Sequence, residues 1–332
     1  MDLSPLVRIL ADGGFHSGRS LGQQLGVTRT VVGQQIELLR AMGVEVHSVT
    51  GKGYRLPTLF DPLSRSAILH MMREQSALWA SRFDLKFSTG STNADAMEMA
   101  RQGETRYLVL AEHQAAGRGR RGREWVSPLG ANIAMSLLWT FELPIAALEG
   151  LSLAVATLVV EGLRNAGYKE GIGVKWPNDI LLRGAKLAGI LIEVGGETAG
   201  PAWVVIGIGI NVRMPWFCQQ QIGQAYTDLA SNFELSMDRN RIVASVLGAL
   251  STGLPVFAKK GFAAFRDAWN ELDVYQGRQV AIVSGSHRSI GLALGVTDSG
   301  ALILDTTAGR QLIAGGELTP SLRPAEEVAC DS

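Results

Sequence analysis

Along the first sixty residues the apolar positions follow a helical period and then alternate. The pattern predicts three short helices and then two strands, at residues 3–11, 17–26, 27–40, 44–49 and 51–56. Two helices joined by a tight glycine-containing turn make a helix-turn-helix, and a strand hairpin directly after it would form a wing. We therefore predict a winged helix-turn-helix over residues 1–60.

The second helix of this motif is the one expected to meet nucleic acid. Val32, Ile36 and Leu39 share its apolar face, which leaves polar side chains near its start. Such residues reach base edges in the major groove, and a cation on the wing lies near phosphate. The DNA-binding candidates are Thr28, Arg29, Thr30, Gln34 and Lys52. The segment has only six Lys and Arg against four Asp and Glu, so a module that packs on the rest of the chain or binds another partner stays open.

The pattern changes after a proline-containing stretch at residues 56–62, which marks a domain boundary. Helices are then expected at residues 64–75, 94–101 and 149–168, and strands at 82–87, 107–111, 132–139, 174–182, 186–193 and 203–211. Residues 238–272 are expected to form two helices, broken near Gly253 to Pro255. We predict a domain built on a mixed sheet over residues 61–273.

Short strands separated by glycine turns dominate the last part of the chain. They are expected at residues 278–283, 289–296, 300–304 and 310–313. Four or five such strands suggest a small SH3-like β barrel, which we place at residues 274–325. The fold class of the whole chain is therefore α+β.

Composition fits a soluble protein of two or three domains. The chain has 332 residues, 46% of them hydrophobic and 19% charged, and its 31 basic residues balance 31 acidic ones. The longest apolar stretch, residues 151–160, is half of the about 20 residues that span a bilayer, and no signal-peptide pattern opens the chain. The two cysteines, Cys218 and Cys330, show no metal-ligand spacing. We expect a cytoplasmic protein that binds no membrane.

A glycine-arginine loop at residues 112–125 lies between two of the predicted strands and carries the first chemical signal. Its glycines let the backbone approach a ligand, and its arginines supply forked donors for phosphate or carboxylate. The spacing of Gly117, Gly119 and Gly122 also satisfies the dinucleotide-binding pattern, which requires a helix directly afterwards. Trp125 and Pro128 follow instead, so we reject that interpretation. A solvated basic loop or an RNA-binding segment stays open on this evidence alone.

Three further segments follow the loop in a fixed order. They are Lys-Trp-Pro-Asn-Asp at residues 175–179, Lys-Leu-Ala-Gly-Ile-Leu at 186–191 and Gly-Ile-Asn at 209–211. Together with Gly-Arg-Gly-Arg-Arg-Gly-Arg at 117–123, they make the chain resemble the biotin protein ligases, and specifically their bacterial bifunctional form, the biotin operon repressors. The resemblance runs nearly end to end. It implies a class II synthetase-like central domain and a substrate site around these motifs.

The resemblance also implies the chemistry. The biotin carboxylate would attack the α-phosphorus of ATP, with Mg²⁺ present, and the resulting biotinyl-5′-AMP would pass biotin to a lysine of the biotin carboxyl carrier protein. This is the activity of a biotin–[acetyl-CoA-carboxylase] ligase. The adenylate would in addition act as corepressor, promoting a homodimer that binds operator DNA and represses biotin synthesis genes.

The resemblance assigns roles to individual residues of this sequence. The expected catalytic residues are Arg118, Arg120 and Lys186, because two anions must meet and positioned cations stabilise them. The expected biotin-binding residues are Ser91, Thr92, Asn93, Gln114, Arg118, Gly119, Arg120 and Lys186. The expected ATP- or adenylate-binding residues are Gly117, Arg121, Arg123, Trp125, Lys175, Asn178, Asn211 and Arg323. The metal ligands stay unknown, with Asp179 as a conceivable contact to Mg²⁺ or to the acceptor lysine.

Three alternatives stay open. The first is a lipoate or octanoate ligase-like enzyme, since such enzymes share the ligase fold. The second is a biotin-sensing repressor without ligase turnover. The third is a nucleic-acid-binding winged helix attached to a structural β domain, which leaves the ordered motifs unexplained.

Overall fold

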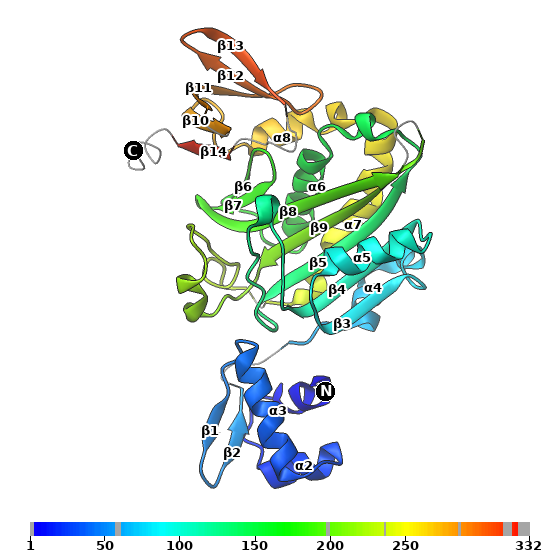
Figure 1. The fold of residues 1–332 in the computed structure, drawn as a ribbon, viewed down its shortest axis with the longest axis vertical. Coiled ribbons are helices and arrows are strands. Elements are labelled where there is room, and N and C mark those ends of the chain that lie inside the picture. Colours follow the sequence, from blue (N-terminus) through cyan, green and yellow to red (C-terminus); the bar gives the residue numbers. More distant parts are fainter. Residues whose placement is uncertain are drawn as a thin grey trace.

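The computed structural model describes residues 3–56, 61–196, 200–235, 237–284, 287–314 and 321–324. Three parts follow one another along the long axis of the molecule (Figure 1): a small N-terminal part, a central sheet with helices, and a C-terminal group of strands. The N-terminal part lies at one end and the C-terminal strands lie at the other. This order agrees with the three regions predicted from the sequence pattern.

The N-terminal part is the predicted winged helix-turn-helix. It consists of α1 (Ser4–Leu10), α2 (Gly18–Leu25), α3 (Arg29–Ala41), β1 (His47–Val49) and β2 (Gly53–Arg55). The hydroxyls of Ser17 and Thr28 cap α2 and α3, and the left-handed Gly26 between them makes the tight turn. The core is formed by apolar side chains of all three helices and is closed by Leu129 and Phe87 from the central part.

The central part is built on a seven-stranded sheet with the strand order β3-β4-β5-β9-β8-β7-β6. Its strands are β3 (Phe83–Thr89), β4 (Arg106–Gln114), β5 (Asn132–Phe141), β6 (Ile172–Lys175), β7 (Asp179–Leu182), β8 (Ala185–Gly196) and β9 (Ala202–Asn211). Only β3 and β4 are parallel, because α5 (Thr92–Arg101) crosses over between them. The sheet is therefore mixed, as predicted.

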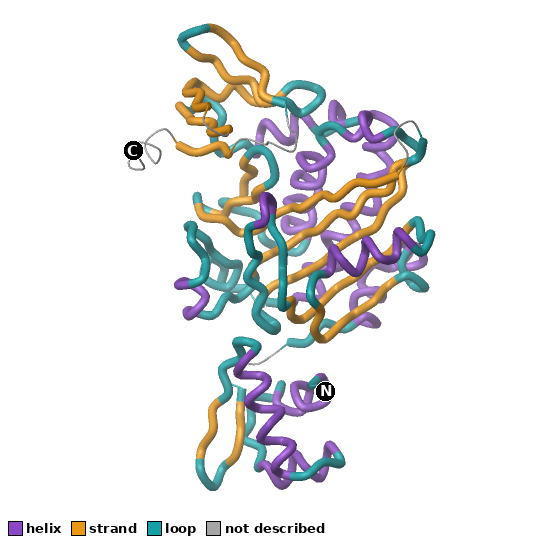
Figure 2. The backbone as a smooth tube through the Cα atoms, in the orientation of Figure 1, coloured by secondary structure: helices purple, strands orange, loops and turns teal. Residues whose placement is uncertain are grey.

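Helices cover both faces of this sheet (Figure 2). On one face α5 packs against β4, β5 and β9. On the other face lie α6 (Leu151–Asn165) and α7 (Arg239–Lys260), with α4 (Arg65–Met72) against α7 and α8 (Arg266–Leu272) against α6. Ile145–Asn165 and Arg239–Lys260 are long and apolar enough to cross a membrane, but 61% and 56% of their most apolar windows are buried in the fold. This burial is what the core helices of a globular domain show.

Two expectations about element boundaries were wrong. Residues 174–182 form two antiparallel strands, β6 and β7, because Pro177 and Asn178 make a turn between them. Arg239–Lys260 is one continuous helix, although it contains Gly253 and Pro255. A Cβ atom on Gly253 would lie 2.3 Å from Leu158 of α6, so this glycine allows the two helices to pack closely. The chain breaks at Gly261 instead.

The C-terminal part is a five-stranded antiparallel sheet with the order β13-β12-β11-β10-β14. Its strands are β10 (Gln279–Ser284), β11 (His287–Val296), β12 (Leu302–Thr306), β13 (Gly309–Ile313) and β14 (Ser321–Pro324), which agrees with the SH3-like prediction. Val280, Val296 and Leu304 belong to the same apolar cluster as the central sheet. The indole N–H of Trp176 also donates to the carbonyl of Gly300 at 3.0 Å, so the small sheet is anchored to the β6–β7 turn.

Candidate functional site

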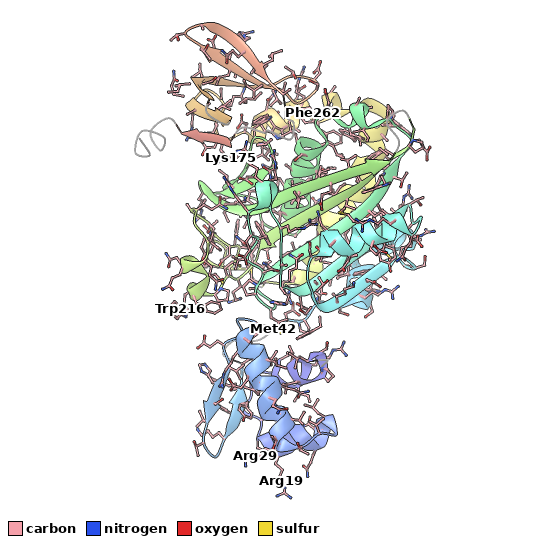
Figure 3. The ribbon with its side chains drawn as sticks, viewed as in Figure 1. Arg19, Arg29, Met42, Lys175, Trp216 and Phe262 are labelled. Carbon is pink, nitrogen blue, oxygen red and sulfur yellow. The ribbon has the colours of Figure 1, made fainter. Side chains whose placement is uncertain are left out.

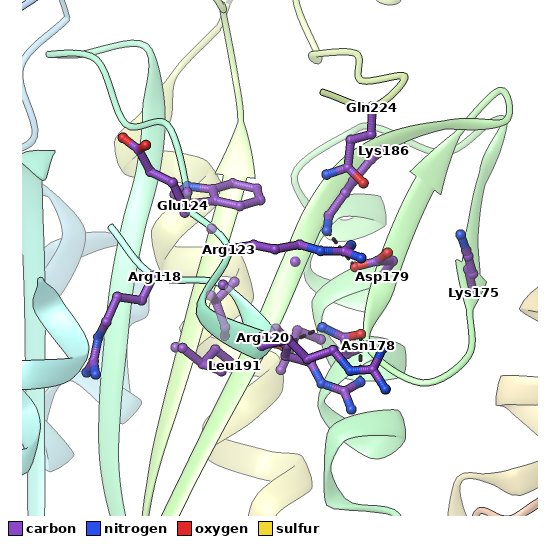
Figure 4. Close-up of a pocket in the computed structure, with 18 of the residues that line it drawn as sticks. Arg118, Arg120, Arg123, Glu124, Lys175, Asn178, Asp179, Lys186, Leu191 and Gln224 are labelled. Atoms are coloured by element: carbon purple, nitrogen blue, oxygen red, sulfur yellow. Dashed lines mark hydrogen bonds and ion pairs between the residues drawn. The ribbon is translucent and has the colours of Figure 1, made fainter. Parts of the chain in front are cut away.

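A cavity of about 430 Å³ lies over one face of the central sheet, between the glycine-arginine loop and the β6–β7 turn (Figure 4). Its walls come from the N-terminus of α5, the loop between β4 and β5, the β6–β7 turn, β8, β9 and the segment around residues 223–225. Of the predicted site residues, it is lined by Ser91, Thr92, Asn93, Gln114, Arg118, Gly119, Arg120, Arg121, Arg123, Trp125, Lys175, Asn178 and Lys186. Motifs that lie about 100 residues apart in the sequence, such as Ser91–Asn93 and Lys186, thus line the same cavity.

One end of the cavity is polar, and Thr92, Asn93 and Ser136 are buried there. The backbone N–H and the hydroxyl of Thr92 lie 2.9 and 3.1 Å from Oε1 of Gln114. Oγ of Ser136 lies 2.7 Å from Oγ1 of Thr92 and 2.6 Å from Oδ1 of Asn93. Nδ2 of Asn93 donates to Oε2 of Glu193 at 2.8 Å. A chain of hydrogen bonds therefore runs from Gln114 to Glu193.

The opposite end of the cavity is cationic. Nζ of Lys186 lies 2.8 Å from Oδ1 of Asp179, and Nη1 of Arg120 donates to Oδ1 of Asn178 at 3.0 Å. Burial lowers the pKa of the Arg120 guanidinium, and the neighbouring Asp179 carboxylate opposes this shift. Figure 4 shows Arg123 pointing toward Asp179 as well. Three basic side chains thus lie near one acidic side chain, that of Asp179. The excess of positive charge suits this end to a carboxylate or a phosphate.

Arg118 belongs to a different part of the site. In Figure 4 its side chain points away from Lys186 and Arg123. Its Nη2 donates to Oε2 of Glu193 at 3.3 Å, and its side chain is 46% exposed. The structure therefore places Arg120 and Lys186 near each other, and Arg118 beside the polar end.

The indole of Trp125 forms one wall, and glycines make room for it. A Cβ atom on Gly209 of β9 would lie 2.4 Å from Cε2 of Trp125, and one on Gly189 of β8 would lie 3.3 Å from Cζ3. Nζ of Lys186 lies 5.8 Å from the centre of the ring. The two glycines thus allow the indole to lie directly on the sheet next to the catalytic candidate.

Inside the loop the backbone takes conformations that favour glycine. Gly122 has a φ of 71° and its neighbour Arg121 a φ of 59°. The chain then returns on itself, because the N–H of Gly119 donates to the carbonyl of Arg123 and that of Trp125 to the carbonyl of Gly117. This tight turn directs the arginines of the loop toward both ends of the cavity.

Three predicted residues lie at the margin of the site or outside what the structure describes. Gly117 is a buried residue of the loop itself, where a Cβ atom would be 2.4 Å from the carbonyl oxygen of Trp125. Asn211 is 4% exposed and donates to the carbonyls of Thr227 and Lys186, so it fixes the neighbouring segment. Arg323 lies on β14, where it pairs with Ala281, but its side chain is outside the described part. The ligand roles of these residues stay predictions.

Sequence reasoning missed two members of the polar network. Ser136 lies in a strand that the pattern marks only as buried, and Glu193 ends a motif whose recognisable part is Lys186. A polar residue in the middle of a buried strand was a usable signal for Ser136, since such groups require partners. Glu193 had no comparable signal, because its partner Asn93 is 100 residues away.

The described residues include no group of three or more His, Cys, Asp or Glu side chains arranged to hold a metal ion. Asp179 and Glu124 are the carboxylates among the cavity-lining residues, and Asp179 is already paired with Lys186. Within the described part of the chain, the side chains therefore do not fit a metal site held by the protein alone.

The predicted DNA-binding residues all lie on the surface of the winged helix. Thr28, Arg29, Thr30, Gln34 and Lys52 are exposed. Thr28 also caps α3 through its hydroxyl, and Lys52 lies 5.9 Å above the ring of Phe15. Arg19 and Arg29 lie at the end of the winged helix that faces away from the central domain (Figure 3). This end is open to a large partner.

Comparison with known families matches all three parts of the chain. Residues 88–211 match the Biotin/lipoate A/B protein ligase family, residues 3–55 match an HTH domain, and residues 275–318 match the Biotin protein ligase C terminal domain. These matches contain the glycine-arginine loop, helix α3 of the winged helix and strands β10 to β13 of the small C-terminal sheet, respectively.

Similar proteins cover the chain nearly from end to end. The Bifunctional ligase/repressor BirA of Escherichia coli is 37% identical over 97% of this chain and 97% of its own length. The protein of the same name from Bacillus subtilis is 32% identical over 94% of this chain. The Biotin--[acetyl-CoA-carboxylase] ligase of Paracoccus denitrificans is 36% identical over 69% of this chain and 97% of its own length. Among solved structures, the biotin protein ligase from Aquifex aeolicus in complex with biotin and ATP aligns with a TM-score of 0.63 and 26% identity over 74% of this chain and 99% of its own.

Proposed function

The chain belongs to the biotin protein ligase family, and from this premise we propose that its cavity condenses biotin with ATP and passes the biotinyl group to a lysine of a biotin carboxyl carrier protein. The observation that carries the proposal is the division of the cavity into a buried polar end and a cationic end. Biotin has the same division, with a neutral ureido ring at one end and a carboxylate at the other.

The first step joins two anions. The carboxylate oxygen of biotin attacks the α-phosphorus of ATP, the bond to the bridging oxygen breaks, and pyrophosphate leaves. Arg120 and Lys186 lie at the cationic end, which we assign to the carboxylate of biotin, and their charges would offset the repulsion between the reactants. Asn178 and Asp179 hold these two cations in place until the substrates replace them as partners.

We assign Arg118 to the same step as a residue of the loop that closes over biotin. Its guanidinium contacts Glu193 at the polar end, so it would fix the loop over the ring or turn toward the carboxylate once ligand is present. Trp125, Lys175 and Asn178 border the space beyond Lys186, which we assign to the nucleotide. A closed loop also keeps water away from the mixed anhydride.

In the second step the amine of an acceptor lysine attacks the carbonyl carbon of biotinyl-5′-AMP, and AMP leaves. The attacking amine must lose a proton. Asp179 is the acidic side chain at the cationic end, and it would orient that amine and accept its proton. No covalent bond to the enzyme is needed in either step.

Mg²⁺ would arrive with ATP. Because the described side chains form no metal-binding cluster, the phosphates of the nucleotide would supply most of its ligands. The steps above are therefore assigned to side chains of the protein alone.

Biotin-dependent exchange of labelled pyrophosphate into ATP tests the proposal. The Arg120→Ala and Lys186→Ala variants should lose about 10²–10³-fold of the exchange rate, since each removes a positioned charge. Lys169→Ala, which removes an exposed cation outside the cavity, should show the exchange rate of the unaltered protein. A folded protein that shows no biotin-dependent exchange would overturn the ligase proposal. Exchange that depends on lipoate and not on biotin would favour the lipoate alternative.

We propose that the same chain is a repressor of biotin synthesis genes. The exposed start of α3 and the exposed Lys52 form a surface suited to the major groove and its phosphates. The adenylate would act as corepressor by promoting a homodimer, which places two recognition helices on a two-fold operator. Sedimentation with and without biotin and ATP tests this step, because a mass unchanged by ligand contradicts it. With these activities, we expect the protein to act in the cytoplasm, where ATP and DNA are found.

A further inference from the structure

Glu193 is the one acidic member of the hydrogen-bond chain at the polar end of the cavity. It lies on β8, its side chain is 24% exposed, and its Oε2 accepts hydrogen bonds from both Asn93 and Arg118. An ionised carboxylate can only accept, whereas every other side chain from Asn93 to Gln114 can both donate and accept. Glu193 therefore determines the direction of the hydrogen bonds among Asn93, Ser136 and Thr92.

The direction is passed on through Asn93. Because Glu193 accepts, the group that faces it must be the amide NH₂, so the amide oxygen of Asn93 faces Ser136 at 2.6 Å. A second acceptor for Nδ2, the carbonyl of Leu191, lies 3.4 Å away at the limit of a hydrogen bond. The carboxylate at 2.8 Å is thus the stronger determinant of the amide orientation.

Ser136 has a single hydroxyl proton and two oxygen neighbours. An oxygen–oxygen contact of 2.6 Å needs a proton between the atoms, so this proton points to Asn93. The shorter contact of 2.7 Å between Ser136 and Thr92 then takes the proton of Thr92, in preference to the contact of 3.1 Å between the Thr92 hydroxyl and Oε1 of Gln114. Oε1 of Gln114 is still satisfied, because it accepts from the backbone N–H of Thr92 at 2.9 Å.

This proton arrangement determines which kind of hydrogen bond Thr92 can make to a ligand in the cavity. Because its proton points to Ser136, the Thr92 hydroxyl presents only a lone pair to a ligand. Without a fixed acceptor at position 193, Asn93 could turn over and donate to Ser136, whose proton would then point to Thr92. The proton of Thr92 would be released, and its hydroxyl could either donate or accept.

We propose that Glu193 is a positioning and specificity-determining residue that makes Thr92 an obligate acceptor, so that the polar end selects a ring with an N–H group at that edge. This inference rests on the proposed biotin site and names how that site recognises the ureido ring. A ligand that places an oxygen where the ureido N–H belongs would bring two lone pairs together. Sites built around such a hydrogen bond reject the wrong partner strongly.

The test uses the full-length protein and two cyclic carbamate analogues of biotin, in each of which oxygen replaces one ureido N–H. The measured quantity is the ratio of kcat/KM for pyrophosphate exchange with biotin to that with each analogue. For one of the two analogues, the unaltered protein should show a ratio of about 10²–10⁴. In Glu193→Leu this ratio should fall by about tenfold or more, with biotin KM raised more than kcat is lowered, because the ring is remote from the reacting carboxylate.

Two further variants make the outcome specific. Glu193→Gln retains an acceptor oxygen for Asn93 and Arg118, so it should keep the ratio of the unaltered protein. Glu142→Leu makes the same substitution at an exposed position, and the ratio should again equal that of the unaltered protein. If Glu193→Leu does not fold, Ser136→Ala breaks the same relay and should lower the ratio in its place.

An unchanged ratio in a folded Glu193→Leu or Ser136→Ala variant would overturn the inference, and so would an equal loss in Glu193→Gln. If the unaltered protein shows no biotin-dependent exchange, the proposed function itself fails. The two failures are distinguishable, because the first leaves biotin turnover by the unaltered protein intact.

Discussion

Oε2 of Glu112 and Nη2 of Arg239 lie 2.7 Å apart, in side chains that are 6% and 3% exposed. Glu112 is on β4 at the start of the glycine-arginine loop, and Arg239 opens α7. Oε1 of Glu112 also accepts the N–H of Leu63, and Arg239 donates to the carbonyls of Asp61 and Asn132. One buried ion pair therefore connects the end of β4, the start of β5 and the first residues after the winged helix.

Removing one partner of this pair should destabilise the protein strongly. Glu112→Ala removes the carboxylate that pairs with the buried guanidinium, at an expected cost of about 3–5 kcal/mol in the free energy of unfolding. Glu112→Gln keeps an acceptor for Leu63 and should cost less. Urea denaturation followed by circular dichroism measures both values.

The exposed pair of Arg82 and Glu104 is the matched control. These atoms lie 3.3 Å apart in side chains that are 47% and 41% exposed, so Glu104→Ala should change the free energy of unfolding by less than about 1 kcal/mol. Equal losses in Glu104→Ala and Glu112→Ala would contradict the anchoring role of the buried pair.

Neither Glu112 nor Arg239 could be recognised from the sequence, and the reason is physical. The periodic pattern predicted the strands and helices that carry them, because each element must bury its own apolar face. The pairing of two charges 127 residues apart depends on how these elements pack together. The same holds for Glu193 and Asn93, whereas Arg120 and Lys186 lie in compact motifs that a resemblance can identify.

The wrong boundary inside α7 has a similar cause. Gly253 and Pro255 are helix breakers by local preference, but α7 continues through both because its packing against α6 outweighs the local cost. Tertiary contacts between α6 and α7 determine the conformation at these residues, and such contacts cannot be predicted from the pattern of a single sequence.

Asp273, where α8 leads into the C-terminal sheet, should make stability depend on pH. Burial raises the pKa of its carboxyl to about 6 from the ordinary 3.8, and the N–H of Tyr275 that it accepts opposes this only in part. Between these values the folded state binds more protons than the unfolded state, so stability falls as the pH rises through this window.

Replacing this carboxyl by an amide removes the effect. Asp273→Asn should be more stable than the unaltered protein by about 2–3 kcal/mol at pH 7.5, and the difference should vanish toward pH 3.5. Urea denaturation of both proteins from pH 3.5 to 7.5 measures the difference directly. A difference that stays constant over this range would show that the Asp273 carboxyl does not titrate differently in the folded state.

Gly209 should be intolerant of a side chain because of Trp125. A Cβ atom at this position would lie 2.4 Å from Cε2 of the indole, and the sheet beneath cannot move away. Gly209→Ala should therefore displace Trp125 and raise the KM for biotin or ATP by about 10–100-fold, the cost of a misplaced substrate.

Gly33 supplies the comparison for this variant. It lies on α3 with no atom within 4 Å of a built Cβ, so Gly33→Ala should leave pyrophosphate exchange unchanged. A Gly209→Ala variant with unaltered KM values would mean that Trp125 does not shape the site.

Gln34 and Lys52 should contribute to DNA binding in different ways. Gln34 has the donor and acceptor pair that reads a base edge, while Lys52 is a cation placed near the backbone. With a DNA fragment selected from a random pool by the adenylate-bound protein, Gln34→Ala should lose about 1–3 kcal/mol on that fragment and little on unrelated DNA. Lys52→Ala should weaken binding to the selected fragment and to unrelated DNA alike. It should also lower the slope of log Kd against log salt concentration by about one, the contribution of a single phosphate contact. Both side chains are exposed and belong to the winged helix, so pyrophosphate exchange should not change. Equal losses of exchange and DNA binding would instead mean that the winged helix supports the ligase site.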